Sequence, residues 1–201
     1  MSNPQPYHHG NLREALIDAA CAAVAEHGHE TLSLRSLAEV VGVARSAPYR
    51  HFPEKDALLA EVALRGFRQL EVLLGSVIQS HNVPGEQLLA AGRSFLSFVR
   101  DNPHLFRLMY EAQLLSPESH FNALADSMAA GYRFLEQIYQ RYAPEPSVRK
   151  SQLRMIGLWS TLYGYAKIRQ GGMLQPYMTS ALSEDEIELA ILECMIDHRP
   201  N

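Results

Sequence analysis

The sequence predicts an all-α protein of about nine helices. Apolar residues recur at spacings of three and four along most of the chain, which places them on one face of a helix. No segment shows the alternation of apolar and polar residues that a half-buried strand requires. Prolines and glycines then divide the helical pattern into separate segments.

The first two helices have recognisable ends. A helix is expected over about 11–27, where Gly28 is a suitable C-terminal stop. Thr31 or Ser33 can cap a second helix, because either hydroxyl can accept a hydrogen bond from the first turn. Gly42 ends this second helix.

A short third helix is expected over 45–51, and Pro53 opens a fourth at a position that proline favours. The fourth helix is long enough to connect a small head to a larger helical body. We therefore predict a head at 8–56 and a body at 57–201. The remaining helices are expected at 85–101, 103–115, 118–142, 147–170 and 183–197.

Two helices joined by a glycine-marked turn can place the second helix in a DNA groove. Arg45 and Ser46 stand at the start of the third helix, where side chains reach base edges, and arginine can bond guanine in bidentate fashion. Lys55 follows in the first turn of the next helix, beside free N–H groups that favour phosphate. A helical hairpin packed in a core is the alternative. The crowding of polar and cationic residues into so short a helix favours DNA binding.

The charge of the chain limits how strongly a general electrostatic field can attract DNA. The formal net charge is −4, and residues 1–56 carry five Lys/Arg against seven Asp/Glu. Within 35–55 the balance reverses to four cations against two acids. A local positive face is therefore expected, rather than a strongly basic domain.

The segment TLSLRSLAEVVGVARSAPYRHFPEKDALL resembles the N-terminal domain of TetR-type transcriptional regulators over about residues 10–60. Gly-Val, then Tyr-x-His-Phe, then Lys-x-x-Leu-Leu carry the resemblance at this spacing. It implies a dimer of nine or ten helices whose heads bind a pseudo-palindromic operator, and a variable body that binds a small molecule and releases the DNA. Carried over by position, the DNA-contacting residues are Ser33, Arg45, Ser46, Tyr49, Arg50, His51 and Lys55.

Two residues depart from the family pattern. Ala44 stands where a Ser or Thr usually caps the recognition helix, a loss of typically ~1 kcal/mol. Pro48 replaces an aliphatic residue, but near a helix start it removes at most one hydrogen bond, so the helix is expected to persist. The opening YHHGNLR also resembles a subset of the family, with His8 and His9 in a solvated or phosphate-facing arm.

The C-terminal segment LWSTLYGYAKIRQGGML resembles the tryptophan- and glycine-containing C-terminal helix of one branch of this family. Small residues at i, i+3, i+4 and i+7 leave one face of this helix nearly bare, which suits the close approach of another helix. The last helix is apolar on two sides. One side consists of Ile187, Ala190, Ile191 and Cys194, and the other consists of Leu189, Leu192 and Ile196. The predicted homodimer interface consists of Gly157, Ser160, Thr161, Gly164, Leu189, Leu192 and Ile196. The alternative is that both helices are buried within one subunit.

Large aromatic and methionine side chains in the body could converge on a ligand. Such residues suit a small, mostly apolar or aromatic effector. The alternative for each of them is an ordinary core position. The candidates are Phe106, Met109, Tyr110, Met128, Tyr132, Leu135, Met155, Trp159 and Tyr163.

These patterns predict a DNA-binding transcriptional regulator, a ligand-released repressor that binds double-stranded operator DNA as a dimer. An all-α enzyme is the second hypothesis, but the chain lacks HExxH, a phosphate loop, a nucleophile elbow and clustered Cys/His ligands. A helical dimer that binds a partner protein and has lost DNA binding is the third. We expect no cofactor, no metal and no membrane span, and a cytoplasmic location, since the N-terminus lacks the apolar core of a signal peptide.

Overall fold

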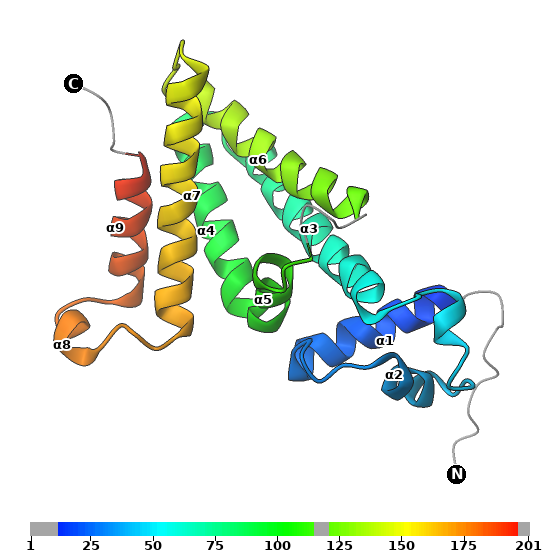
Figure 1. The fold of residues 1–201 in the computed structure, drawn as a ribbon. Helices are drawn as coiled ribbons and strands as arrows, with labels where there is room; N and C mark the ends of the chain where they lie inside the picture. The colour runs from blue at the N-terminus through cyan, green and yellow to red at the C-terminus, as the bar shows by residue number, and fades with distance from the viewer. Residues whose placement is uncertain (1–11, 115–120, 197–201) are drawn as a thin grey trace. The chain divides into compact units, whose positions relative to one another are not determined.

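The computed structural model describes residues 12–114 and 121–196 and confirms the all-α prediction for them (Figure 1). These ranges contain nine α-helices and one 3-10 helix, η1, and no strand. The predicted arm with His8 and His9 lies outside the described residues. The elements are α1 (Leu12–His27), α2 (Leu34–Val41), η1 (Pro48–Arg50), α3 (Lys55–Ser80), α4 (Pro84–Asp101), α5 (Pro103–Glu111), α6 (Asn122–Tyr142), α7 (Val148–Gln170), α8 (Pro176–Thr179) and α9 (Glu184–Ile196).

The chain divides into two compact units. Unit 1 comprises the described residues up to Gly66 together with those of His104–Ala125. Unit 2 comprises Phe67–Pro103 and the described residues from Asp126 onward. Both α3 and α6 contribute residues to each unit. None of the helices in the described ranges is long and apolar enough to cross a membrane.

In unit 1, α1 packs against α2 and η1. Glycines end the first two helices as predicted, because Gly28 (φ 79°) and Gly42 (φ 76°) adopt the left-handed conformation that glycine tolerates best. Ser33, rather than Thr31, caps α2: its Oγ accepts the Ser36 N–H at 3.0 Å, and the Ser36 hydroxyl completes a capping box.

The predicted helix over 45–51 is wrong in its extent. Regular helical structure is limited to the 3-10 turn Pro48–Arg50, and a separate turn precedes it, in which the Ala47 N–H donates to the Ala44 carbonyl at 2.8 Å. Pro48 has no N–H to continue a ladder of i→i−4 hydrogen bonds. The methyl side chain of Ala44 cannot accept a hydrogen bond and so cannot cap a helix. Arg45 and Ser46 therefore lie in the turn before η1.

Some other boundaries also differ from the expected ones. Helix α3 begins at Lys55, so Pro53 lies outside it. Helix α5 ends at Glu111, and Gln113 shortly afterwards has a positive φ of 52°. The short helix α8 at Pro176–Thr179 was not predicted.

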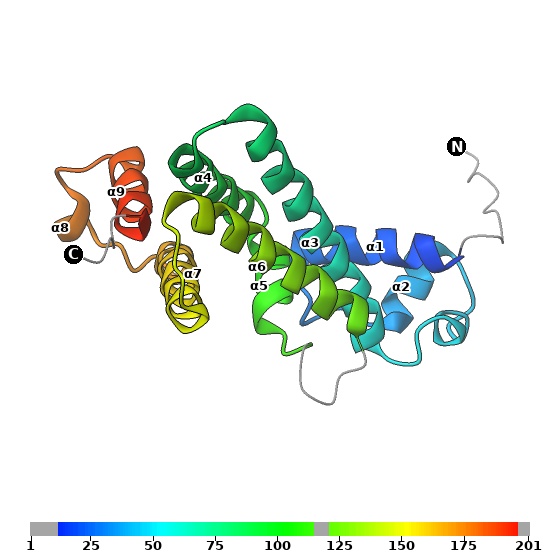
Figure 2. The same cartoon turned by 90° about the horizontal axis from the view of Figure 1, so that it is seen from above.

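In unit 2, helices α4, α7 and α9 pack on one another, and they lie side by side in both views (Figures 1 and 2). Their contact is built from buried apolar residues such as Phe95, Leu162 and Leu192. Gly92 allows a close approach of α4 to α9, because a Cβ atom at this position would overlap the Leu192 side chain.

Candidate nucleic-acid interface

Two buried residues anchor the segment from Ala44 to Phe52 to the interior of unit 1. Pro48 and Phe52, one helical turn apart, point into unit 1, and Phe52 is only 1% exposed. The Arg13 guanidinium lies 5.4 Å from the centre of the Phe52 ring and also pairs with Glu61 at 2.6 Å. Pro48 and Phe52 therefore anchor the segment to unit 1.

This anchoring leaves the polar side of the segment exposed. The exposed residues are those that the sequence singled out as DNA contacts: Arg45, Ser46, Tyr49, Arg50 and His51. A short exposed segment with two guanidiniums, two hydroxyls and an imidazole presents donors for phosphate oxygens and base edges. The structure thus brings these five predicted residues together on one segment.

Arg45 is engaged with an acidic neighbour. Its Nη2 lies 2.9 Å from Glu39 Oε1 on α2, and both side chains are well exposed, at 63% and 57%. An exposed pair of this kind contributes about 0–1 kcal/mol, so a phosphate or base can replace it at small cost. Glu39 nevertheless reduces the positive potential of the segment.

Ser33 caps α2, in addition to its predicted contact with DNA. Its hydroxyl oxygen accepts the Ser36 N–H, and its O–H donates to Ser36 Oγ at 2.9 Å. A phosphate contact by Ser33 therefore requires its O–H to change partner, while the accepted bond can remain.

Lys55 is the first residue of α3, where the first four backbone N–H groups have no partner within the helix. Its Nζ donates to the Glu30 carbonyl at 3.0 Å, which uses one of the three ammonium hydrogens. The Glu30 carboxylate pairs in turn with Arg107 of α5. Lys55 is thus held in place beside a helix N-terminus that favours anions.

Two histidines lie next to this arrangement. The Nδ1 atoms of His29 and His104 are buried and make no hydrogen bond to the described residues. Burial lowers the pKa of His29, and the positive charges of Arg107 and Lys55 lower it further. The His29 imidazole is therefore held neutral near pH 7 and adds no cation to the interface.

Arg35 is an exposed cation that is not among the predicted DNA contacts. It lies at the second position of α2, two residues after Ser33, and its side chain is exposed. The periodicity of α2 predicts this exposure, because its apolar residues repeat at Leu34, Leu37 and Ala38 and leave Arg35 on the outer side.

The predicted ligand-binding residues fall into both units. Phe106, Met109 and Tyr110 belong to unit 1. Phe106 is fully buried, and its ring packs at a tilt against that of Tyr110 with ring centres 5.1 Å apart. Burial raises the pKa of the Tyr110 hydroxyl.

The other predicted ligand-binding residues belong to unit 2: Met128, Tyr132, Leu135, Met155, Trp159 and Tyr163. Met155 is a core side chain, whereas Met128 and Tyr132 are exposed. The Trp159 ring lies 5.4 Å from that of Phe95 and 5.8 Å from that of Tyr163. The cavities described in unit 2 are lined by other residues.

The small-residue face of α7 is open within the chain. A Cβ atom at Gly157 or Gly164 would meet no atom within 4 Å. Ser160 is exposed between them, and the Thr161 hydroxyl bonds back to the Gly157 carbonyl at 3.0 Å. Within the described part of the chain, the space that a side chain at Gly157 or Gly164 would occupy is therefore open.

For α9 the predicted interface side needs correction. Leu192 is 0% exposed and Ile196 is also buried, so both belong to the core of unit 2; Leu189 is half-buried. The outer side of α9 instead carries Ala190 and Cys194. The sequence shows that the helix has two apolar sides, but periodicity alone does not tell which one packs inward.

Two family models match the sequence. The one described as "Bacterial regulatory proteins, tetR family" matches residues 16–62, and "Tetracyclin repressor-like, C-terminal domain" matches residues 88–191.

Solved structures share the fold over nearly the whole chain. A protein of unknown function from Rhodococcus sp. RHA1 is 26% identical, with a TM-score of 0.79 over 96% of this chain and 97% of that one. The TetR-like transcriptional regulator LfrR from Mycobacterium smegmatis, solved in complex with proflavine, is 19% identical, with a TM-score of 0.61 over 94% and 96%. The TetR family transcriptional regulator PfmR from Thermus thermophilus is 20% identical, with a TM-score of 0.62 over 92% and 99%. Since the C-terminal match alone spans more than half of the chain, the protein belongs to the TetR family and is a DNA-binding transcriptional regulator.

Proposed function

We propose that this protein is a ligand-released repressor that binds a pseudo-palindromic operator as a homodimer. The observation that carries the proposal is the exposed polar segment before and within η1, held by the buried anchors Pro48 and Phe52. In this proposal residues 8–56 form the DNA-binding head and residues 57–201 the ligand-binding and dimerisation body.

The exposed residues divide by the kind of contact they suit. Arg45 and Ser46 lie where the chain enters the segment, and we assign them to base edges. Lys55 and the α3 N-terminus suit a phosphate, as do the hydroxyl of Tyr49 and the Arg35 guanidinium. The further phosphate contacts are assigned to Ser33, Arg50 and His51.

The second part of the proposal is that two copies of the chain pair through α7. Gly157 and Gly164 leave room for a second helix, and exposed Leu153 and Ile156 lie beside them on the helix. Two copies paired by a two-fold axis would present two heads, as an operator with half-sites about 34–36 Å apart requires.

A small, mostly apolar or aromatic effector would release the DNA. The complex of LfrR with proflavine supports this part, since a regulator with the same fold binds a small aromatic molecule. Met128 and Tyr132 are the exposed members of the predicted contacts in unit 2, and Trp159 and Tyr163 are half-buried. A regulator of this kind acts where the chromosome is, in the cytoplasm, and needs no cofactor.

The test is a gel shift with DNA flanking the gene, at several salt concentrations. Lys55→Ala should weaken binding to all sequences and lower the salt slope by about one. Arg45→Ala should relax the preference at one base position, by about 1–3 kcal/mol. Lys150→Ala, an exposed lysine in unit 2, is the matched control and should bind as the wild type does. Unchanged specificity in Arg45→Ala would remove that residue from the base contacts.

The second candidate is a dimer that binds a partner protein and has lost DNA binding. The excess of acidic residues in the head and the engagement of Arg45 by Glu39 favour it. A protein that shifts no DNA at any salt concentration, with or without effector, would support this second function and contradict the first.

A further inference from the structure

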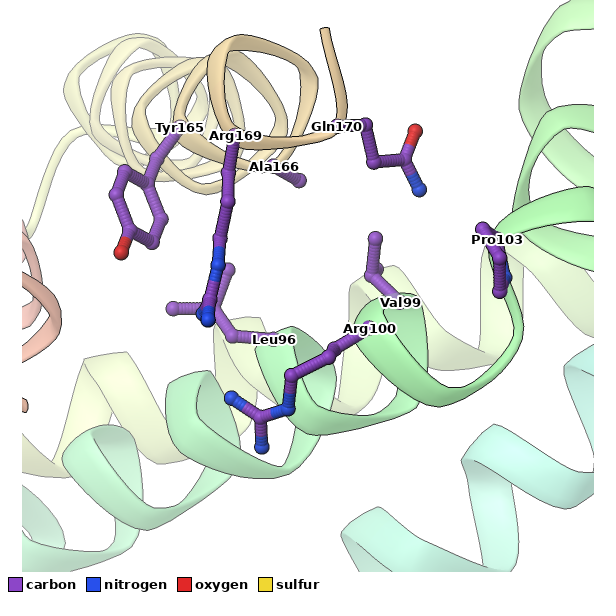
Figure 3. Close-up of a pocket in the computed structure, with 8 residues that line it drawn as sticks. All are labelled: Leu96, Val99, Arg100, Pro103, Tyr165, Ala166, Arg169 and Gln170. Atoms are coloured by element: carbon purple, nitrogen blue, oxygen red, sulfur yellow. The ribbon is translucent and has the colours of Figure 1, made fainter. Parts of the chain in front are cut away.

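A cavity of about 210 Å³ lies in unit 2 between α4 and α7 (Figure 3). Its apolar walls are Leu96 and Val99 from α4, Ala166 from α7, and Pro103 just after α4. This volume is below the roughly 300 Å³ at which sites for drug-sized ligands begin. The cavity therefore suits a compact apolar body.

Two of the four polar residues that line the cavity are arginines. Arg100 of α4 and Arg169 of α7 both line it, together with Tyr165 and Gln170. Figure 3 shows the Arg169 side chain extending from α7 towards α4, with Gln170 and Pro103 on the opposite side. Burial raises the pKa of Tyr165, so its hydroxyl stays protonated near neutral pH.

The two guanidiniums share one well-shielded carboxylate. Glu188 of α9 lies 3.5 Å from Arg100 Nη1 and 3.6 Å from Arg169 Nη1, and its side chain is 17% exposed. The second partner of Arg169 is Glu184, at 2.5 Å, and this carboxylate is 80% exposed. An ion pair with such an exposed partner contributes little, so a better-placed anion can displace Glu184.

We propose that this cavity binds the effector, and that the effector is a small acid with a single carboxylate on an apolar body. The inference rests on the proposed function, and it goes further by naming the chemical class and the residues. The apolar body occupies the space between Leu96, Val99 and Ala166, and the carboxylate takes the place of Glu184 on Arg169. Arginine suits this role because its planar fork matches a carboxylate bidentately. None of the ligand contacts predicted from the sequence lines this cavity, so the site replaces those contacts and adds a charged one for the effector.

Isothermal titration calorimetry of the purified protein without DNA tests the inference. The probes are cinnamate and octanoate, with cinnamamide and octanamide as neutral counterparts of the same shape. At pH 7 the acids should bind and the amides should bind at least about tenfold more weakly, since a bond to a charged group is lost. Equal binding of acid and amide would overturn the role of the guanidinium. Inorganic phosphate that binds as tightly as the acids would overturn the role of the apolar walls.

Variants locate the site. Arg169→Gln should weaken binding of both acids about tenfold or more. Glu184→Gln removes the competing carboxylate but keeps both arginines, so it should tighten binding, and it does not depend on tolerance of a change at Arg169. Arg93→Gln makes the same change at an exposed arginine of α4 that does not line the cavity, and it should leave binding unchanged.

Acid binding and the shift of operator DNA test the cavity and the repressor proposal separately. If no acid binds while the protein still shifts operator DNA, the cavity is not an acid site and the repressor proposal stands. If the acids bind but no DNA is shifted, the site stands and the repressor proposal fails. Unchanged acid binding in both Arg169→Gln and Glu184→Gln would show that the acids bind elsewhere.

Discussion

Replacing Gly157 and Gly164 together by leucine separates the stability of one chain from the association of two. Within the chain, a Cβ atom at either position meets no atom within 4 Å. Glycine in a helix interior is about 0.8–1.0 kcal/mol less favourable than a good helix former. The double variant should therefore gain up to about 2 kcal/mol of helix stability in the isolated subunit.

Association should respond in the opposite direction. If two copies pair through this face, the added side chains enter the space that the partner helix occupies. Overpacking costs about 1–3 kcal/mol per site, and two-fold symmetry brings each substitution to the contact from both subunits. Even the lower limit for Gly164 alone, about 2 kcal/mol, raises the dimer dissociation constant roughly thirtyfold.

Sedimentation equilibrium measures the association, and urea unfolding at low protein concentration measures the stability. Gly131→Leu is the matched control, because Gly131 lies in α6 and its Cβ position is equally open. The control should gain about 1 kcal/mol of stability and associate as the wild type does. A double variant that associates like the control would refute the assignment of this face to the dimer contact.

Three further predictions concern the head and the body. Glu39→Gln frees Arg45 and removes a negative charge near the proposed DNA contacts, so gel shifts at low salt should show about two- to fivefold tighter binding; unchanged affinity would place Glu39 away from the DNA. Gly92→Ala should lower the free energy of unfolding in urea by about 1–3 kcal/mol, because its methyl group overlaps a side chain of α9; a gain of about 1 kcal/mol would show that the helices move apart freely. Because the pKa of His29 is lowered from 6.5 by burial, the unfolded chain binds its proton more readily, and its contribution to stability is present above pH 6.5 and lost as the pH falls below it. His29→Gln should flatten that fall in unfolding experiments across this range, and parallel curves for both proteins would assign it to another group.

The first two helices could be predicted because their limits are local. Gly28 and Gly42 end them by adopting a left-handed conformation, and Ser33 starts α2 by bonding to a backbone N–H three residues away. Each signal involves groups within one helical turn, so it can be read from a short window of sequence.

For the segment from Ala44 to Phe52, the sequence predicts which residues are exposed but not the conformation of the backbone. From the sequence, Pro48 removes at most one hydrogen bond from a helix that persists, whereas the structure has only the 3-10 turn Pro48–Arg50. The buried position of Pro48 shows that it also anchors the segment, together with Phe52. That role depends on the surface that α1 and α2 present to η1, which the local sequence does not describe.

Local sequence patterns were enough to predict the fold class, the family and the exposed polar character of the segment around η1. Helical periodicity, capping residues and a closely spaced motif are all local properties. Three features depend instead on the packed fold: which apolar side of α9 packs inward, the ion pair between Glu39 and Arg45, and the meeting of Arg100 and Arg169 around Glu188 at one cavity. A helix with two apolar sides, or an arginine on a helix surface, acquires its partner only when helices distant in the sequence pack together.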